Sequence, residues 1–151
     1  GVVTGLSDPD AIAAAHRRLA GLASEHGGVV LAEEMARGDL ELIVAVHRDG
    51  VVPALVIGLG GVWTELLGDV AVVPLPADAP RIERALATLR GGPMLTGGRG
   101  RAPLDVGAVA RLAERIGALL VERSLALVEC NPVLVATDGA VALDAAIRLA
   151  G

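Results

Sequence analysis

The stretch LALVECNPVLVATDGAVALD, from Leu125 to Asp144, decides which fold this sequence predicts. Two runs rich in aliphatic residues, Ala126–Val135 and Ala140–Ile147, flank Thr137-Asp138-Gly139. Asp-Gly between two such runs is a strong short-range signal of a β-hairpin. The stretch therefore predicts two antiparallel strands joined by a tight turn.

Polar residues interrupt this apolar hairpin at three positions. Glu129 and Asn131 are two residues apart, so their side chains point to the same face of a strand. If the hairpin turns at residues 137–139, the numbers of directly paired residues add to about 275 or 276. Asn131 then lies opposite Asp144 or its neighbour. We expect these three oxygen-bearing side chains to share one patch of the sheet.

Two interpretations of this patch remain open from spacing alone. Mg²⁺ prefers carboxylate and amide oxygens, and it usually binds through one or two carboxylates together with substrate phosphates. Isolated carboxylates are also common on the solvated face of a strand. The spacing supports a metal site and an exposed outer face about equally.

The rest of the chain predicts further helices and strands with recognisable boundaries. Ser7-Asp8-Pro9 is typical of a helix start, because it combines a capping side chain with Pro in the first turn. Asp105 is placed to cap another helix in the same way. The expected strands are the end of one at Gly1–Gly5, then Val29–Met35, Leu40–His47, Val51–Gly58 and Asp69–Pro74, and the expected helices run to about Glu25, over Ala79–Leu89 and to about Arg123.

The order of these elements favours one fold class. Strands and helices do not alternate regularly, so a doubly wound parallel sheet is disfavoured. The three consecutive strands between residues 29 and 58 indicate an antiparallel meander. We expect an α+β fold with a mostly antiparallel sheet flanked by helices. The sequence shows no repeat or obvious linker, which predicts one domain over residues 1–151.

Composition excludes several classes of protein. Hydrophobic residues make up 53% of the chain, with one Trp and no Phe or Tyr, so the core must be aliphatic. The net charge of −5 and the lack of a basic cluster exclude nucleic acid as an expected partner. A single cysteine, Cys130, excludes an internal disulfide and a cysteine-based zinc site. No apolar run approaches ~20 residues and no signal peptide is recognisable, so we expect a cytoplasmic protein without a membrane partner.

The hairpin and the residues before it resemble a known family. Val121–Val135, followed by Asp138-Gly139 and Leu143-Asp144, is similar to the end of the ATP-grasp domain in the β subunits of succinyl-CoA synthetase and ADP-forming acetyl-CoA synthetase. The resemblance implies that Asn131 and Asp144 hold the Mg²⁺ that bridges the nucleotide phosphates. It places Glu129 at the matching acidic position beside them.

Two further segments extend the resemblance. The glycine stretch Gly58-Leu-Gly-Gly61, with Glu65 and Asp69 after it, follows the fused acyl-CoA synthetase version. This match implies that Gly58, Gly60 and Gly61 approach the nucleotide phosphates, although a lone glycine loop is more often only a turn. The second glycine loop, Gly97–Gly100, carries a weaker implication of the same kind.

A hinge that meets the adenine is the other implied feature. Val30–Met35 and the strand after it resemble the family's hinge, where a carboxylate commonly binds the ribose hydroxyls. Glu33, Glu34 and Glu41 are the nearest matches. The sequence does not decide between Glu33 and Glu34, which point to opposite sides of an extended chain.

The sequence also departs from the family. Cys130 replaces the usual aliphatic residue, and Ala146 stands where the fused subgroup often has Arg. All thirteen basic residues are Arg, whereas the family clamps the nucleotide with a lysine on a strand preceding the segment that Gly1–Thr4 resembles. None of the three histidines matches the family's phosphorylated histidine. We therefore expect a domain fragment that lacks the lysine-bearing strand and binds nucleotide poorly alone.

The functional expectation is the ATP- or ADP- and Mg²⁺-binding portion of an acyl-CoA synthetase. Its parent is expected to be an acid–thiol ligase that forms ADP or GDP, with CoA-binding and acyl domains on the same or a partner chain. We expect no catalytic residue in this chain, and an oligomer is compatible with the pattern. One alternative is a degenerate regulatory or interaction module beside an acyltransferase. The other is an ATP-grasp ligase that joins a carboxylate to an amine, which the Gly58–Asp69 match disfavours.

Overall fold

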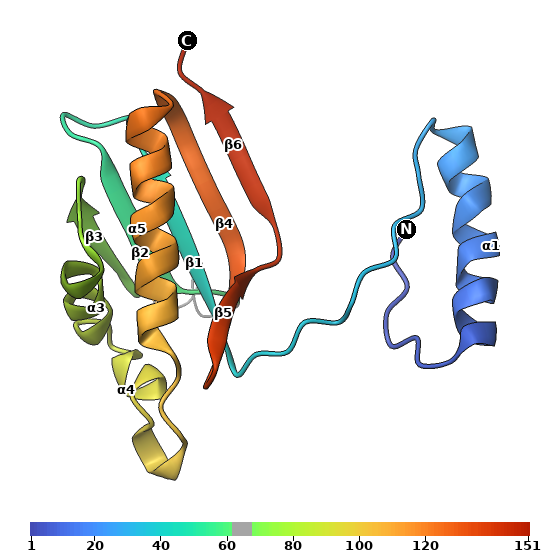
Figure 1. The fold of residues 1–151 in the computed structure, drawn as a ribbon, viewed down its shortest axis with the longest axis horizontal. Coiled ribbons are helices and arrows are strands. Elements are labelled where there is room, and N and C mark those ends of the chain that lie inside the picture. Colours follow the sequence, from blue (N-terminus) through green and yellow to red (C-terminus); the bar gives the residue numbers. More distant parts are fainter. Residues whose placement is uncertain (62–67) are drawn as a thin grey trace. The chain divides into compact units, whose positions relative to one another are not determined.

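A computed structural model of the chain describes residues 1–61 and 68–151, without the side chain of residue 99 (Figure 1). Glu65, which the resemblance places after the glycine stretch, lies outside the described residues. The described chain forms two compact units, Gly1–Met35 and Ala36–Gly151. None of the described helices has the combined length and hydrophobicity that a bilayer crossing demands.

The first unit is built on one helix, α1 (Pro9–Glu25). Its start confirms the sequence prediction, since the Asp8 side chain accepts a hydrogen bond from the Ala11 N–H at 2.8 Å. The strands expected at Gly1–Gly5 and Val29–Met35 are wrong, because the structure assigns neither segment to a strand. A strand needs a paired neighbour for its backbone N–H and C=O groups, and no described strand pairs with these segments.

The second unit is a six-stranded sheet in which every pairing is antiparallel. The strand order is β3-β2-β1-β4-β5, with β6 also paired to β4. The expected meander is present, but it is formed by the first three strands of this unit. The strands are β1 (Leu40–His47), β2 (Ala54–Leu59), β3 (Val70–Pro74), β4 (Leu125–Ala136), β5 (Gly139–Ala142) and β6 (Ala145–Leu149).

Two helices cover one face of this sheet. Figure 1 shows α5 (Val106–Glu122) and α3 (Ala79–Ala87) lying over the strands. The short α4 (Gly92–Leu95) and a 3₁₀ turn, η1 (Gly98–Gly100), connect them. The predicted cap of α5 is confirmed, because the Asp105 side chain accepts from the Ala108 N–H at 2.8 Å. The prediction of an α+β fold with an antiparallel sheet flanked by helices is therefore correct.

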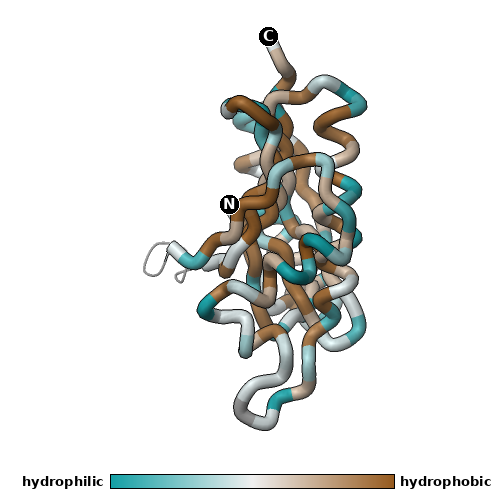
Figure 2. The backbone as a smooth tube through the Cα atoms, turned by 90° about the vertical axis from the view of Figure 1, so that its left-hand side faces the viewer, coloured by the Kyte–Doolittle hydropathy of each residue, from teal (hydrophilic) through white to brown (hydrophobic). Residues whose placement is uncertain are grey.

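The helix-covered face contains an aliphatic core, as the composition predicts. Leu42, Val44 and Val46 alternate along β1 and are fully buried. Leu55 and Ile57 of β2 continue this layer. Figure 2 shows how hydrophobic and hydrophilic residues are interspersed along the chain, as expected when strands present one apolar face.

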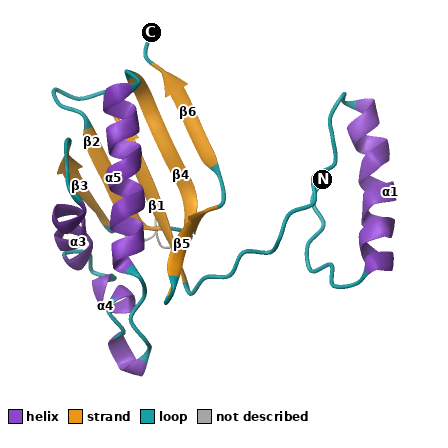
Figure 3. Cartoon of the chain, viewed as in Figure 1, coloured by secondary structure: helices purple, strands orange, loops and turns teal. Residues whose placement is uncertain are grey.

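The opposite face of the sheet is covered by no described helix of the second unit (Figure 3). We call this surface the open face. On β4, Val128, Cys130 and Val133 are buried on the helix side. Glu129 and Asn131 alternate with Val128 and Cys130 and therefore lie on the open face. A register shift between the Cys130 and Val133 pairings with β1 returns Val133 to the helix side.

Candidate functional site

The register of the hairpin confirms the pairing predicted from its turn. Leu134 pairs with Val141 on β5, and Cys130 pairs with Ala145 on β6. Between these two ladders the Asn131 N–H donates to the Asp144 carbonyl oxygen at 3.3 Å. Asn131 therefore lies directly opposite Asp144.

The returning strand is not continuous, contrary to the single strand expected over Ala140–Ile147. It divides into β5 and β6 around Leu143 and Asp144. The Asp144 Oδ1 accepts from the Ala145 N–H at 2.8 Å, a local hydrogen bond of the kind that competes with a strand ladder. The interruption leaves the exposed Asp144 beside the polar residues of β4.

The three predicted side chains meet in one hollow on the open face. The Asn131 Nδ2 donates to Glu129 Oε1 at 3.3 Å. Glu129, Asn131 and Asp144, with Ala145 and Ala146, line a hollow of about 210 Å³. The structure thus brings together the residues that the sequence placed on one patch.

These donors fit a magnesium ion. Because Asn131 uses its NH₂ group on Glu129, its amide oxygen is the atom left to act as a ligand. Asp144 uses Oδ1 on Ala145, which leaves Oδ2 for a cation. The described residues contain no group of three or more His, Cys, Asp and Glu side chains that could hold a metal ion by themselves. A pair of carboxylates with one amide, completed by water and phosphate, matches the sparse protein ligation that Mg²⁺ accepts.

The predicted glycine stretch lies beside the start of β1. The Gly60 N–H donates to the Glu41 carbonyl oxygen at 2.8 Å. A Cβ on Gly61, which has φ of +63°, would lie 3.0 Å from Glu41 Oε2. Glu41, Gly60 and Gly61 therefore lie close together.

Gly58 is required by a close backbone approach. A Cβ at this position would meet the Asp69 carbonyl oxygen and would lie 2.7 Å from the side chain of Val70. Gly58 pairs with Ile43 on β1, which pairs on its other side with β4. Only β1 thus separates the glycine stretch from the Asn131–Asp144 hollow.

The other two predicted nucleotide residues belong to the first unit. Glu33 and Glu34 lie in an exposed segment without helix or strand. Because this unit is described by itself, a role for either residue together with Glu41 stays a prediction. The choice between Glu33 and Glu34 stays open.

Asp69, the acidic residue after the glycine stretch, is held by the turn between α3 and α4. Its side chain is buried, with the residue 7% exposed. Oδ1 accepts from the Arg90 N–H at 2.9 Å and Oδ2 accepts from the Gly91 N–H at 2.8 Å. Its only sequence signals are an acidic residue directly before an apolar strand and the paired glycines 91 and 92.

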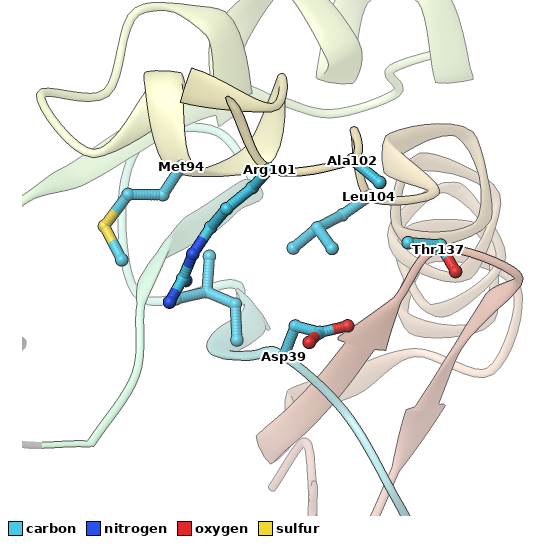
Figure 4. A pocket seen from close by; sticks show the side chains of 7 residues that line it. Asp39, Met94, Arg101, Ala102, Leu104 and Thr137 are labelled. Atoms are coloured by element: carbon cyan, nitrogen blue, oxygen red, sulfur yellow. The ribbon is translucent and has the colours of Figure 1, made fainter. Parts of the chain in front are cut away.

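The second glycine loop is explained by packing. A Cβ on Gly97 would lie 2.6 Å from the Arg101 carbonyl oxygen, and one on Gly98 would lie 2.7 Å from that of Pro93. These close approaches favour a compact turn at Gly97–Gly100 over a phosphate cradle. Arg101, directly after the loop, lines a separate pocket of about 230 Å³, in which Figure 4 shows it on one side and Asp39 and Thr137 on the other.

Cys130 is a small core side chain. It is buried on the helix side of β4, where loss of solvation raises the pKa of its thiol. The negative charge of the adjacent Glu129 raises the pKa further. A thiol held in its neutral form is unreactive, so Cys130 is a packing residue.

Comparison with known proteins agrees with this geometry. The model of a family described as an ATP-grasp domain matches residues 1–149. The chain belongs to the ATP-grasp family. This ATP-grasp domain is 38% identical over 120 residues to a trans-feruloyl-CoA synthase from an unknown prokaryote. It is 31% identical over 124 residues to the β subunit of the ADP-forming acetate–CoA ligase I of Pyrococcus furiosus.

The domain covers only part of these relatives. The matches include 77% and 81% of this chain, but 17% of the synthase and 53% of the β subunit. A solved structure of the acetyl-coenzyme A synthetase 1 of Ca. Korarchaeum cryptofilum, in complex with coenzyme A and Mg-AMPPCP, is also similar. It has a TM-score of 0.86 and 30% identity, and the match covers 99% of this chain and 68% of that one. The domain is thus homologous to NDP-forming acyl-CoA synthetases.

Proposed function

We propose that this ATP-grasp domain binds ATP or ADP with Mg²⁺ on the open face of its sheet, as part of an NDP-forming acyl-CoA synthetase. The observation that carries the proposal is the hairpin register, in which Asn131 faces Asp144 and hydrogen-bonds Glu129. Asn131 and Asp144 would hold the metal ion, with Glu129 beside them. When bound, Mg²⁺ offsets negative charge on the nucleotide phosphates.

The remaining residues would position the nucleotide. The lack of side chains at Gly58, Gly60 and Gly61 would let phosphate oxygens come close to this stretch, since glycine lets a ligand approach the backbone. Glu41, together with Glu33 or Glu34, would accept hydrogen bonds from the ribose hydroxyls. The complex of the Korarchaeum relative with Mg-AMPPCP supports a nucleotide on this fold.

The proposed parent activity is an acid–thiol ligase that forms ADP or GDP. It is supported by relatives named as synthases or ligases of CoA thioesters. CoA-binding and acyl domains would lie on the same or a partner chain, as expected when this domain supplies the nucleotide half of the reaction. The complete Asn131, Asp144 and Glu129 set favours this activity over a degenerate regulatory module.

Calorimetric titration of Mg²⁺–ADP into the full-length protein that carries this domain tests the nucleotide site. We expect Asn131→Ala combined with Asp144→Ala to weaken Mg²⁺-dependent binding by about 100-fold or more, because both protein ligands are removed. Asp138→Ala removes a carboxylate from the turn of the same hairpin and should leave binding unchanged. Equal affinity of the double variant and the unaltered chain would falsify the metal assignment.

A further inference from the structure

Asp69 stands out among the described residues because it is charged and buried, yet it lies outside the proposed metal hollow. Each carboxylate oxygen accepts one backbone N–H, from Arg90 and from Gly91. Burial of a carboxylate is costly unless its oxygens are hydrogen-bonded. The two short bonds therefore tie Asp69 firmly to the turn between α3 and α4.

The backbone of Asp69 makes a second connection. Its carbonyl oxygen accepts from the Leu59 N–H at 3.3 Å, at the end of β2. The same oxygen occupies the space that a Cβ on Gly58 would need. One residue thus joins the first half of the glycine stretch to the α3–α4 turn.

The turn itself packs directly under the glycine stretch. A Cβ on Gly91 would collide with the side chain of Leu59, which is 1% exposed and adjacent to Gly60. From the other side, the Gly60 N–H is held by the Glu41 carbonyl oxygen. The glycine stretch is therefore fixed between β1 and the junction of Asp69, Leu59 and Gly91.

We propose that Asp69 is a positioning residue that sets the Gly58–Gly61 backbone for binding the nucleotide phosphates, without touching the nucleotide. The inference rests on the proposed nucleotide function. Asp69 acts through hydrogen bonds to the α3–α4 turn, which packs on Leu59 at Gly91, and through its carbonyl oxygen, which accepts from the Leu59 N–H. Losing these bonds should loosen the glycine stretch while leaving the Asn131–Asp144 hollow intact.

Asp69→Asn gives the direct test, because the near-isosteric amide places an NH₂ group against a backbone N–H. We expect affinity for ADP to fall about tenfold relative to affinity for adenosine, which has no phosphates. We also expect hydrogen exchange of the Leu59 and Gly60 amides to accelerate at least about tenfold in the nucleotide-free chain. Gly91→Ala disturbs the same junction from the opposite side and should reproduce both effects if Asp69→Asn does not fold.

Asp78→Asn is the matched control. Asp78 caps the other end of α3 by accepting from the Arg81 N–H at 3.0 Å, so its loss lowers stability without reaching the glycine stretch. The ratio of ADP to adenosine affinity should stay unchanged in this variant.

The outcomes separate the two proposals. If the unaltered chain binds ADP, and Asp69→Asn or Gly91→Ala leaves the affinity ratio and the two amides unchanged, the positioning role is overturned and the nucleotide site stands. If the unaltered full-length protein that carries this domain binds neither ADP nor adenosine, the nucleotide site and the positioning role both fall. If Asp69→Asn lowers the ratio of ADP affinity to adenosine affinity and speeds hydrogen exchange at the Leu59 and Gly60 amides, both the nucleotide site and the positioning role are supported.

Discussion

Adjacent residues of β4 point to opposite faces of the sheet and have different roles. Cys130 packs in the aliphatic core, whereas Glu129 lines the hollow on the open face. The pKa of the Cys130 thiol is raised first by burial and then by the charge of Glu129. Glu129, which lines the candidate site, thus also raises the pKa of a thiol in the core.

The raised thiol pKa predicts a pH dependence of stability. An unfolded thiol has a pKa of about 8.5, so above this pH the unfolded state binds fewer protons than the folded state. The free energy of unfolding should therefore fall as pH rises from about 8.5 towards the folded pKa, by at most about 1.4 kcal/mol per pH unit for one proton. The chain has no Lys or Tyr to titrate in this range.

Urea denaturation between pH 7 and 10 measures this effect. Cys130→Ala should remove the fall in the free energy of unfolding above about pH 8.5. The slope of this free energy with pH is compared between the two proteins, because the substitution also changes the absolute stability. Identical slopes in both proteins would contradict the assignment of the raised pKa to Cys130.

Arg48 has a structural role that the sequence did not reveal. Its Nε donates to the Leu125 carbonyl oxygen at 3.1 Å, and its Nη2 donates to that of Leu120 at 3.0 Å. A cation at the C-terminus of α5 also interacts favourably with the helix dipole. Arg48 therefore fastens α5 to the first strand of the sheet.

Arg48→Ala should lower the free energy of unfolding by about 1.5–3 kcal/mol, the range for hydrogen bonds to a charged group. Arg115→Ala, at an exposed position on α5, is the control and should stay within about 0.5 kcal/mol. Equal effects of the two substitutions in chemical denaturation would show that the Arg48 bonds contribute nothing.

At the scale of elements, local signals predicted those helices and strands that carry their own boundaries. Asp8 and Asp105 cap α1 and α5 where the sequence placed the caps. Alternating apolar residues located β1 over Leu40–His47 without error. The Asp138-Gly139 turn fixed the register of β4 and hence the site.

Features that depend on distant partners were not predictable in this way. Val29–Met35 has the composition of a strand, but a strand also requires a neighbour to pair with. The clamp formed by Asp69 depends on donors 21 and 22 residues away, and no local pattern announces them. β2 begins at Ala54 rather than Val51 because Pro53 has no N–H to donate and the two valines before it are exposed.

The two-faced sheet predicts different costs for apolar truncation. Leu42→Ala removes a fully buried side chain from the helix-covered face and should cost about 2–5 kcal/mol. Val72→Ala lies at a position that is 62% exposed on β3 and should cost less than about 1 kcal/mol. Thermal or urea unfolding of both variants checks this difference. If Val72→Ala lowers the free energy of unfolding as much as Leu42→Ala does, the exposed valines of β3 are buried in solution.

At the scale of the whole molecule, the two units differ in how much core they contain. The aliphatic core cluster is formed by residues between Leu40 and Ala142, all in the second unit. Deletion of residues 1–35 should therefore leave a cooperative unfolding transition, with a midpoint within about 5 °C of the full chain. Loss of cooperative unfolding in a calorimetric scan would show that the second unit depends on the first.

The central claim is that the β4–β6 hairpin binds a divalent cation at Asn131 and Asp144. Paramagnetic broadening of backbone amide signals by Mn²⁺, added with ADP, locates the ion directly. The account predicts that broadening is strongest at Asn131, Ala145 and Ala146, and that Asn131→Ala combined with Asp144→Ala abolishes it there. Broadening centred instead on Asp138 at the turn, or on Asp8 and Asp10 of the first unit, would contradict the claim.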